Sequence, residues 1–156
     1  VITPTAQKAL AGTFLASQID FPSTPPHVKP LDQTCFLVIC RDGPDSAGPR
    51  NEHLAGHLEH VENNWTRYIS AGPIREPGGE ALVGSVFLVL ADTLDEAQKL
   101  MEGDPYITCG MYESIDYKVF SNSIGQHIGG KIWESVDAIR HRAAGGPLNN
   151  LKQGLS

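Results

Sequence analysis

The segment from Cys35 to Phe120 alternates between strand-like and helix-like hydrophobic patterns, and this alternation restricts the possible folds. Two continuous apolar runs, Cys35–Asp42 and Leu82–Ala91, have the length and composition of buried strands. The segment Ser114–Phe120 alternates apolar and polar residues, which is typical of a half-buried strand. A short extended piece, Ile69–Arg75, contains a proline and therefore fits an edge strand.

Two helices are expected between these strands. The segment His53–Ile69 has its apolar residues on one side at helical spacing, with Asn51 as a candidate N-cap. The expected buried stripe consists of Leu54, Leu58, Val61, Trp65, Tyr68 and Ile69. The run Thr93–Glu96 has the pattern of a capping box, and Gly103 fits the end of the helix that it opens. The Gly- and Pro-containing segment at residues 43–50 is expected to be a loop.

The resulting order is strand, helix, strand, strand, helix, strand, which is the ferredoxin-like βαββαβ unit of the α+β class. Right-handed crossovers place both helices on one face of the sheet, so the other face is apolar and uncovered within this unit. We expect the sheet of a second subunit to cover that face, and therefore a homodimer. The expected domain, residues 35–120, lies between an N-terminal extension, residues 1–34, and a C-terminal helix and tail, residues 121–156. Helices are expected over Ala6–Gln18 and Ile132–Ala144.

The composition argues against two classes of partner. A net charge of −6 gives no basic surface for nucleic acid. No apolar run approaches the ~18 residues that span a membrane.

The three cysteines, Cys35, Cys40 and Cys109, cannot all pair within one chain, and free thiols favour a cytoplasmic location. The chain begins with Val1 rather than Met, so the sequence leaves open whether a segment has been removed.

This region contains several short motifs in a defined order: His57-Leu58, Ala71-Gly72-Pro73, Gly84-Ser85, Glu96-Ala97, Gly103-Asp104-Pro105-Tyr106 and Gly110-Met111-Tyr112-Glu113. Together they resemble the YCII family. Each motif is short, and it is their order and spacing that carry the resemblance. The resemblance implies a dimeric α+β barrel with a cleft beside a histidine and an aspartate, which correspond to His57 and Asp104 here. The enzymatic relatives in that family are dehydrochlorinases, and muconolactone isomerases share the broader fold.

A carboxylate beside an imidazole fixes the tautomer of the imidazole and raises its basicity, which suits proton transfer near neutral pH. We therefore expect a lyase or isomerase without a cofactor, acting on a small cyclic or aromatic-derived metabolite. In this interpretation His57 is the general base or acid and Asp104 orients it. The candidates for substrate binding are Tyr106, Tyr112, Ser85 and Arg67. The alternative is a non-catalytic small-molecule-binding or accessory protein with the same cleft.

The histidines His53, His57 and His60 follow one another at spacings of four and three on the first expected helix. Imidazoles on neighbouring turns can chelate zinc or copper. No cysteine or second histidine cluster completes a ligand set, so we expect a solvated polar ridge and no metal. The cysteines are expected to be buried free thiols, and the alternative interpretation is that one of them is a nucleophile.

Overall fold

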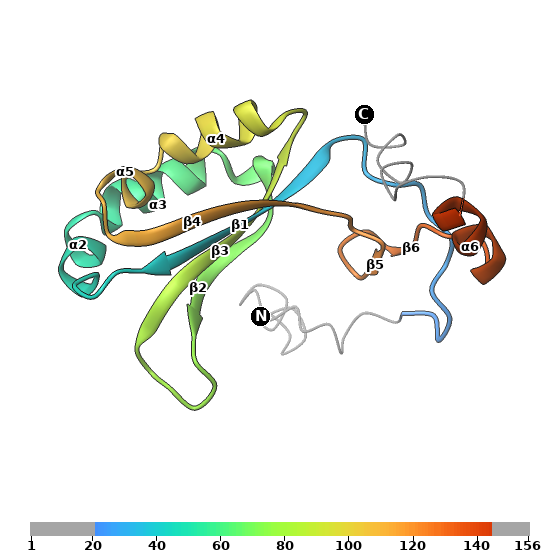
Figure 1. Ribbon diagram of the computed structural model, residues 1–156, viewed down its shortest axis with the longest axis horizontal. Coiled ribbons are helices and arrows are strands. Elements are labelled where there is room, and N and C mark those ends of the chain that lie inside the picture. The colour runs from blue at the N-terminus through green and yellow to red at the C-terminus, as the bar shows by residue number, and fades with distance from the viewer. Residues whose placement is uncertain (1–20, 145–156) are drawn as a thin grey trace, which may run out of the picture.

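The computed structural model describes residues 21–144, in which a four-stranded antiparallel sheet carries helices on one of its faces (Figure 1). The strands are β1 (Thr34–Asp42), β2 (Tyr68–Arg75), β3 (Leu82–Ala91) and β4 (Tyr112–Phe120). Their order in the sheet is β2-β3-β1-β4, so β1 and β3 are central and β2 and β4 form the edges. This arrangement confirms the α+β class and the ferredoxin-like connectivity. The helix expected over residues 6–18 lies outside the described residues.

The helices on this face are α2 (Ala47–Glu52), α3 (Leu54–Asn63), α4 (Leu94–Glu102) and α5 (Pro105–Thr108). Helix α4 begins as expected, because Thr93 Oγ1 accepts the N–H of Glu96 at 3.2 Å. The Glu96 carboxylate reaches back to the N–H of Asp92 at 3.0 Å, one residue before the cap. These bonds satisfy donors at the helix start that have no partner inside the helix.

The hydrophobic core lies between the sheet and these helices. Successive side chains of a strand point to opposite faces, so every second residue of β1 and β3 enters the core. The core residues of these two strands are Phe36, Val38, Cys40, Phe87, Val89 and Ala91. Helix α4 covers them with Ala97, Leu100 and Met101. The register pairs Cys40 with Ser85, which places the Ser85 hydroxyl on the same face as the core.

Two boundaries of the first crossover differ from the prediction. The helix expected over His53–Ile69 ends at Asn63, because Asn64 Nδ2 donates to the carbonyl of His60 at 2.8 Å and closes the last turn. The 3-10 turn η2 (Trp65–Arg67) then leads directly into β2. Trp65 is therefore 72% exposed, and the prediction that it belongs to the core is wrong.

The start of this crossover is also helical where a loop was expected. Helix α2 begins at Ala47 and places Pro49 in its first turn, where the missing N–H of proline costs no helical hydrogen bond. Asn51 lies inside α2, and the N-cap of α3 is His53, without a side-chain capping bond. The side chain of Arg50, in α2, donates from Nη2 to the carbonyl of Gly84 in β3 at 3.0 Å, which ties this helix to the sheet.

The segments outside the sheet pair with each other. After β4 come β5 (Ile124–Gly125), β6 (Gly130–Lys131) and α6 (Val136–Ala144), so the C-terminal helix begins later than the expected Ile132. The N–H of Val28 donates to the carbonyl of Lys131 at 2.8 Å, and the N–H of Lys131 donates to Pro26 at 2.9 Å. The described part of the N-terminal extension is thus attached to the C-terminal segment. Among the described residues, no helix combines the length and apolar character that crossing a membrane requires.

Candidate active site

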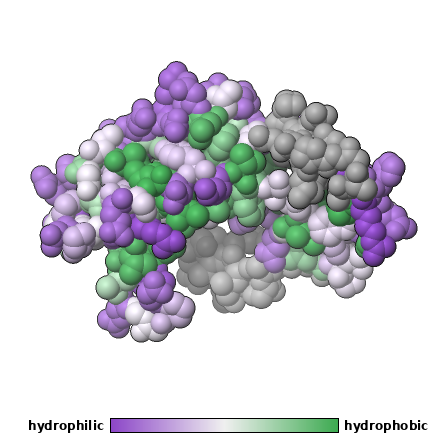
Figure 2. Space-filling view, in the orientation of Figure 1, coloured by the Kyte–Doolittle hydropathy of each residue, from purple (hydrophilic) through white to green (hydrophobic). Residues whose placement is uncertain are grey.

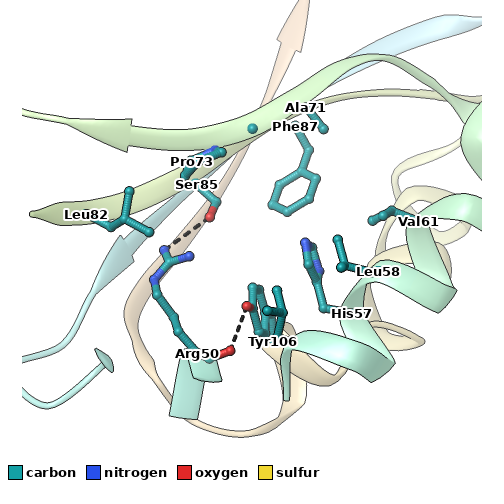
Figure 3. Close-up of a pocket in the computed structure, with 12 residues that line it drawn as sticks. Arg50, His57, Leu58, Val61, Ala71, Pro73, Leu82, Ser85, Phe87 and Tyr106 are labelled. Carbon is teal, nitrogen blue, oxygen red and sulfur yellow. Dashed lines mark hydrogen bonds between the residues drawn. The ribbon is translucent and has the colours of Figure 1, made fainter. Parts of the chain in front are cut away.

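A pocket of about 340 Å³ lies between α3, α5 and the β2–β3 edge of the sheet. Its apolar lining consists of Leu54, Leu58, Val61, Ala71, Gly72, Pro73, Leu82 and Phe87. Its polar lining consists of Arg50, His57, Ser85 and Tyr106 (Figure 3). Figure 2 shows apolar side chains gathered around α3 and near the β2–β3 edge, and Leu54 and Leu58 are 43% and 45% exposed. An apolar hollow with a few convergent polar groups is typical of a small-molecule site.

His57 projects from α3 into this pocket and contacts Asp104. Its Nδ1 lies 2.8 Å from Asp104 Oδ2 and 3.0 Å from Oδ1. The side chain of His57 is 16% exposed, and that of Asp104 is 0% exposed. An ionised carboxylate can only accept hydrogen bonds, so with Asp104 in that form Nδ1 is the donor, and in the neutral imidazole the lone pair is then on Nε2. The fold thus brings together the two residues that the sequence motifs singled out.

The local sequence around Asp104 explains why its carboxylate is fixed. Asp104 has the extended backbone that a following proline favours, with φ −88° and ψ 121°. It is the N-cap of α5, and its Oδ1 accepts the N–H of Tyr106 at 3.0 Å. The carboxylate is therefore held by its own helix as well as by His57.

Tyr106 lines the pocket, as expected, but its hydroxyl is used within the protein. The ring of Tyr106 stacks on the imidazole of His57 with centroids 4.0 Å apart and an interplanar angle of 6°. The hydroxyl donates to the carbonyl of Arg50 at 2.8 Å. Burial raises the pKa of Tyr106, so the phenol stays protonated at neutral pH. This arrangement suits a residue that positions the imidazole.

Arg50 lines the pocket and was not among the residues chosen from the sequence. Its Nε and Nη2 donate to the two carboxylate oxygens of Asp42 at 2.9 and 2.8 Å. Nη2 also lies 3.2 Å from Ser85 Oγ. The two charged side chains are 11% and 5% exposed. The sequence signal that could have found this pair is Asp42 itself, since a carboxylate that ends an apolar strand requires a partner.

The ion pair holds both Asp42 and Arg50 in their charged forms at this end of the pocket. Burial alone would raise the pKa of Asp42, but hydrogen bonds from Arg50 and Ser46 outweigh burial and hold it below its usual value. The hydrogen bond to Asp42 raises the pKa of Arg50. Both groups therefore stay charged at neutral pH.

Ser85 and Tyr112 continue this polar end of the site. The Tyr112 hydroxyl donates to Ser85 Oγ at 2.9 Å, and the two residues are 9% and 4% exposed. Burial raises the pKa of Tyr112, which therefore remains a neutral donor. Ser85 lines the pocket, whereas Tyr112 is not among the lining residues and is connected to the pocket by its hydrogen bond to Ser85.

Arg67 does not meet the other candidates. It lies in η2, donates from Nε to the carbonyl of Leu90 at 3.1 Å, and borders a separate hollow with His60 and Asn64. The early end of α3 is the physical reason, because the chain changes direction before Arg67 is reached. Arg67, expected as a substrate-binding residue, therefore does not line the pocket that holds His57.

The histidines of the ridge make separate contacts, and the Cys40 thiol is buried. Within residues 21–144, no group of three or more His, Cys, Asp or Glu side chains is arranged to hold a metal ion. His57 is engaged by Asp104, and His60 packs against Gly103. Burial, together with the nearby Asp104 charge, raises the pKa of Cys40 to about 12, so its thiol is protonated at neutral pH.

Comparison with known proteins agrees with the fold. Residues 34–121 match the YCII family, described as a YCII-related domain. Protein YciI of Escherichia coli and protein YciI of Shigella flexneri are each 27% identical over 92 residues, covering 54% of this chain and 94% of the relative. A solved structure of 5-chloro-2-hydroxyhydroquinone dehydrochlorinase (TftG) from Burkholderia phenoliruptrix, in complex with 2,5-dihydroxybenzoquinone, is similar with a TM-score of 0.52. It is 25% identical, and the match covers 60% of this chain and 97% of that one.

Proposed function

This chain belongs to the YCII family, and we propose that it is a cofactor-independent lyase or isomerase acting on a small cyclic or aromatic-derived compound. The fold shared with a dehydrochlorinase supports an enzyme that processes a small molecule. The observation that carries the proposal is the contact of His57 Nδ1 with the buried carboxylate of Asp104 at 2.8 Å. This contact leaves Nε2 as the basic atom available to a molecule in the pocket.

The proposed reaction begins with proton transfer. His57 Nε2 takes a proton from a carbon or hydroxyl that a neighbouring ring oxygen makes acidic, and the electron pair left behind forms a new double bond. In a lyase, the leaving group departs with its bonding electron pair, and His57 gives up its proton to that group or to water. In an isomerase, His57 returns the proton to a different carbon. A positioned acid–base group accelerates proton transfer by about 10²–10⁴-fold, which suffices for turnover when the ring is already activated.

The size and lining of the pocket support a single-ring substrate. A volume of about 340 Å³ is small for a ligand site, and the apolar walls favour a flat, weakly polar body. The related dehydrochlorinase takes its name from 5-chloro-2-hydroxyhydroquinone and is complexed with 2,5-dihydroxybenzoquinone. Compounds with one oxygenated six-membered ring are therefore the first class to test as substrates.

Two reactions test this proposal. The first is chloride release from 5-chloro-2-hydroxyhydroquinone, and the second is deuterium exchange of the ring hydrogens of 2,5-dihydroxybenzoquinone in D₂O, followed by proton NMR. The second assay needs no leaving group, so it reports proton transfer alone. The unmodified protein should accelerate at least one of them, and His57→Gln should lower that rate by about 10²-fold or more.

The matched control is His53→Gln, because His53 lies just before α3 and does not line the pocket. It should keep the wild-type rate. Binding of 2,5-dihydroxybenzoquinone without any rate enhancement would favour the non-catalytic alternative. Equal rates for the wild type and His57→Gln would remove His57 from the mechanism.

We also propose that the protein acts as a homodimer. The face of the sheet that points away from the helices carries Leu37 and Ile39 of β1, paired with Leu88 and Val86 of β3. All four are partly exposed, and α3, α4 and α5 lie on the opposite face (Figure 1). A second sheet packed about 10 Å away would bury these side chains on both partners.

A further inference from the structure

A second hollow, of about 430 Å³, adjoins the pocket that holds His57. It lies between α2, the start of α3 and the start of β3, and we call it the α2 hollow. Four residues line both spaces: Arg50, Leu54, Leu82 and Tyr106. In Figure 3 Leu82 lies on the far side of Arg50 from His57, which is the direction of the α2 hollow. A molecule that binds beside His57 can therefore extend past Leu54 and Leu82 into this second space.

The walls of the α2 hollow are mostly apolar, and part of their surface is open to water. The residues that line this hollow and not the His57 pocket are Asp42, Ser46, Ala47, Asn51 and Ala81. Ala47 and Ala81 are exposed, and Leu54 on the shared border is 43% exposed. An apolar group that covers such surface binds favourably, because it removes apolar area from water on both sides.

The charged groups at the border of this hollow are already paired with each other. Asp42 accepts hydrogen bonds from Arg50 Nε and Nη2 at 2.9 and 2.8 Å, and from Ser46 Oγ at 2.8 Å. The side chain of Asp42 is only 5% exposed. A charged group that entered the hollow would give up its water for an ion pair whose charges already balance. The hollow therefore suits a neutral, apolar group.

We propose that the substrate is a ring compound with a short, neutral alkyl substituent, which occupies the α2 hollow while the ring lies beside His57. This inference rests on the proposed function for the ring and its chemistry, and it narrows the substrate class. The substituent lies away from the atoms that exchange protons, so it contributes equally to binding of the ground state and of the transition state. It should therefore lower KM and leave kcat nearly unchanged.

The binding of phenol and 4-butylphenol, measured by equilibrium dialysis at a pH where both are neutral, tests the hollow without any reaction. Each carbon of the chain that is buried should raise the affinity about two- to fourfold. The wild type should therefore bind 4-butylphenol about 10- to 100-fold more tightly than phenol. Equal affinity for the two compounds, or no binding of 4-butylphenol at millimolar concentration, would overturn the proposal.

Two substitutions that fill the hollow assign this preference to it. Ala47→Phe and Ala81→Phe each add a phenyl ring to one wall, from α2 and from the residue before β3. The ratio of the two affinities should fall to near unity in at least one of them. The control is Ala55→Phe, which adds the same ring at an exposed position of α3 that lines neither space, and it should keep the wild-type ratio. An unchanged ratio in both filling variants, or an equal loss in the control, would refute the proposal.

Kinetics separate this inference from the proposed function. If both hold, the 3-butyl derivative of 2,5-dihydroxybenzoquinone should have a KM at least about tenfold below that of the parent compound in the deuterium-exchange assay, with a similar kcat. A protein that prefers 4-butylphenol to phenol but accelerates neither of the two test reactions would support the hollow and contradict the proposed function. Proton transfer that depends on His57, without any preference for the butyl group, would support the proposed function and overturn the hollow.

Discussion

The imidazole of His57 lies flat against the phenol ring of Tyr106, with the centroids 4.0 Å apart and the planes 6° from parallel. The two residues come from α3 and α5, and Tyr106 directly follows the Asp104–Pro105 dipeptide. The stack therefore ties the helix that carries the imidazole to the segment that carries its carboxylate partner. An aromatic pair of this kind contributes about 0.5–1.5 kcal/mol beyond its buried area.

Two substitutions of Tyr106 should distinguish the effect of ring stacking from the effect of the hydroxyl hydrogen bond. Tyr106→Phe keeps the ring and loses the hydrogen bond to the Arg50 carbonyl, so the free energy of unfolding should fall by about 1 kcal/mol with little change in turnover. Tyr106→Leu loses the stack as well, and a displaced imidazole should lower kcat/KM by up to about 10²-fold. Urea unfolding and steady-state kinetics measure the two effects. Equal kinetics for the two variants would show that the ring does not position His57.

Two substitutions of Asp104 should distinguish its role in fixing the tautomer of His57 from its role as the N-cap of α5. Asp104→Asn retains a side-chain oxygen that can cap α5, so the fold should persist, but it removes the carboxylate that holds the Nδ1 proton. We expect turnover to fall by about 10²–10⁴-fold and the pH–rate profile to change. Asp104→Ala should show the same kinetic loss and, in addition, a loss of about 1 kcal/mol in stability. If Asp104→Asn retained wild-type kinetics, Asp104 would have only a structural role.

Much of the architecture can be predicted from local sequence patterns. The apolar runs of β1 and β3 alternate between buried and partly exposed residues, and only strands fit their length. Thr93 caps α4 through a bond between neighbouring residues, so spacing alone predicts it. Asp104 is held by the dipeptide that follows it, which is also a local property.

The features that the sequence did not reveal depend on contacts made in the folded chain. The position of Arg50 is set by Asp42 and by the sheet edge at Gly84, which only the fold brings together. Leu54 and Leu58 follow the helical period of a core stripe, yet they line the pocket, and periodicity cannot distinguish a pocket wall from a core. Trp65 is exposed because one side-chain bond from Asn64 ends the helix before it.

The Asp42–Arg50 pair should make stability depend on acid pH. The pKa of Asp42 is lowered from its ordinary value of 3.8, so the ionised form is favoured by folding. Its contribution is complete above that value and is lost as the pH falls through the lower folded-state pKa. Asp42→Asn leaves the buried guanidinium of Arg50 without a charged partner. The wild type should therefore be more stable than this variant by about 3–5 kcal/mol at pH 7, and this difference should shrink below about pH 4.

Urea unfolding at several pH values between 7 and 3 measures this difference. The matched control is Asp95→Asn, which breaks the exposed pair with Lys99, whose side chains are 72% and 73% exposed. An exposed pair contributes at most about 1 kcal/mol, so the control should lose little stability at any of these pH values. A stability difference between the wild type and Asp42→Asn that stayed constant down to pH 3 would contradict the role of the ionised carboxylate.

The helix-free face of the sheet should set the oligomeric state. Leu37 and Leu88 are direct partners across β1 and β3 on this face, so a lysine at either position would place a charge in the proposed sheet-to-sheet interface. We expect the wild type to have the mass of a dimer by sedimentation at micromolar concentration, and Leu37→Lys or Leu88→Lys to have the mass of a folded monomer. Leu94→Lys is the control, because Leu94 is 44% exposed at the start of α4 on the other side of the sheet. A wild-type monomer, or dimers in both lysine variants, would show that this face does not form the interface.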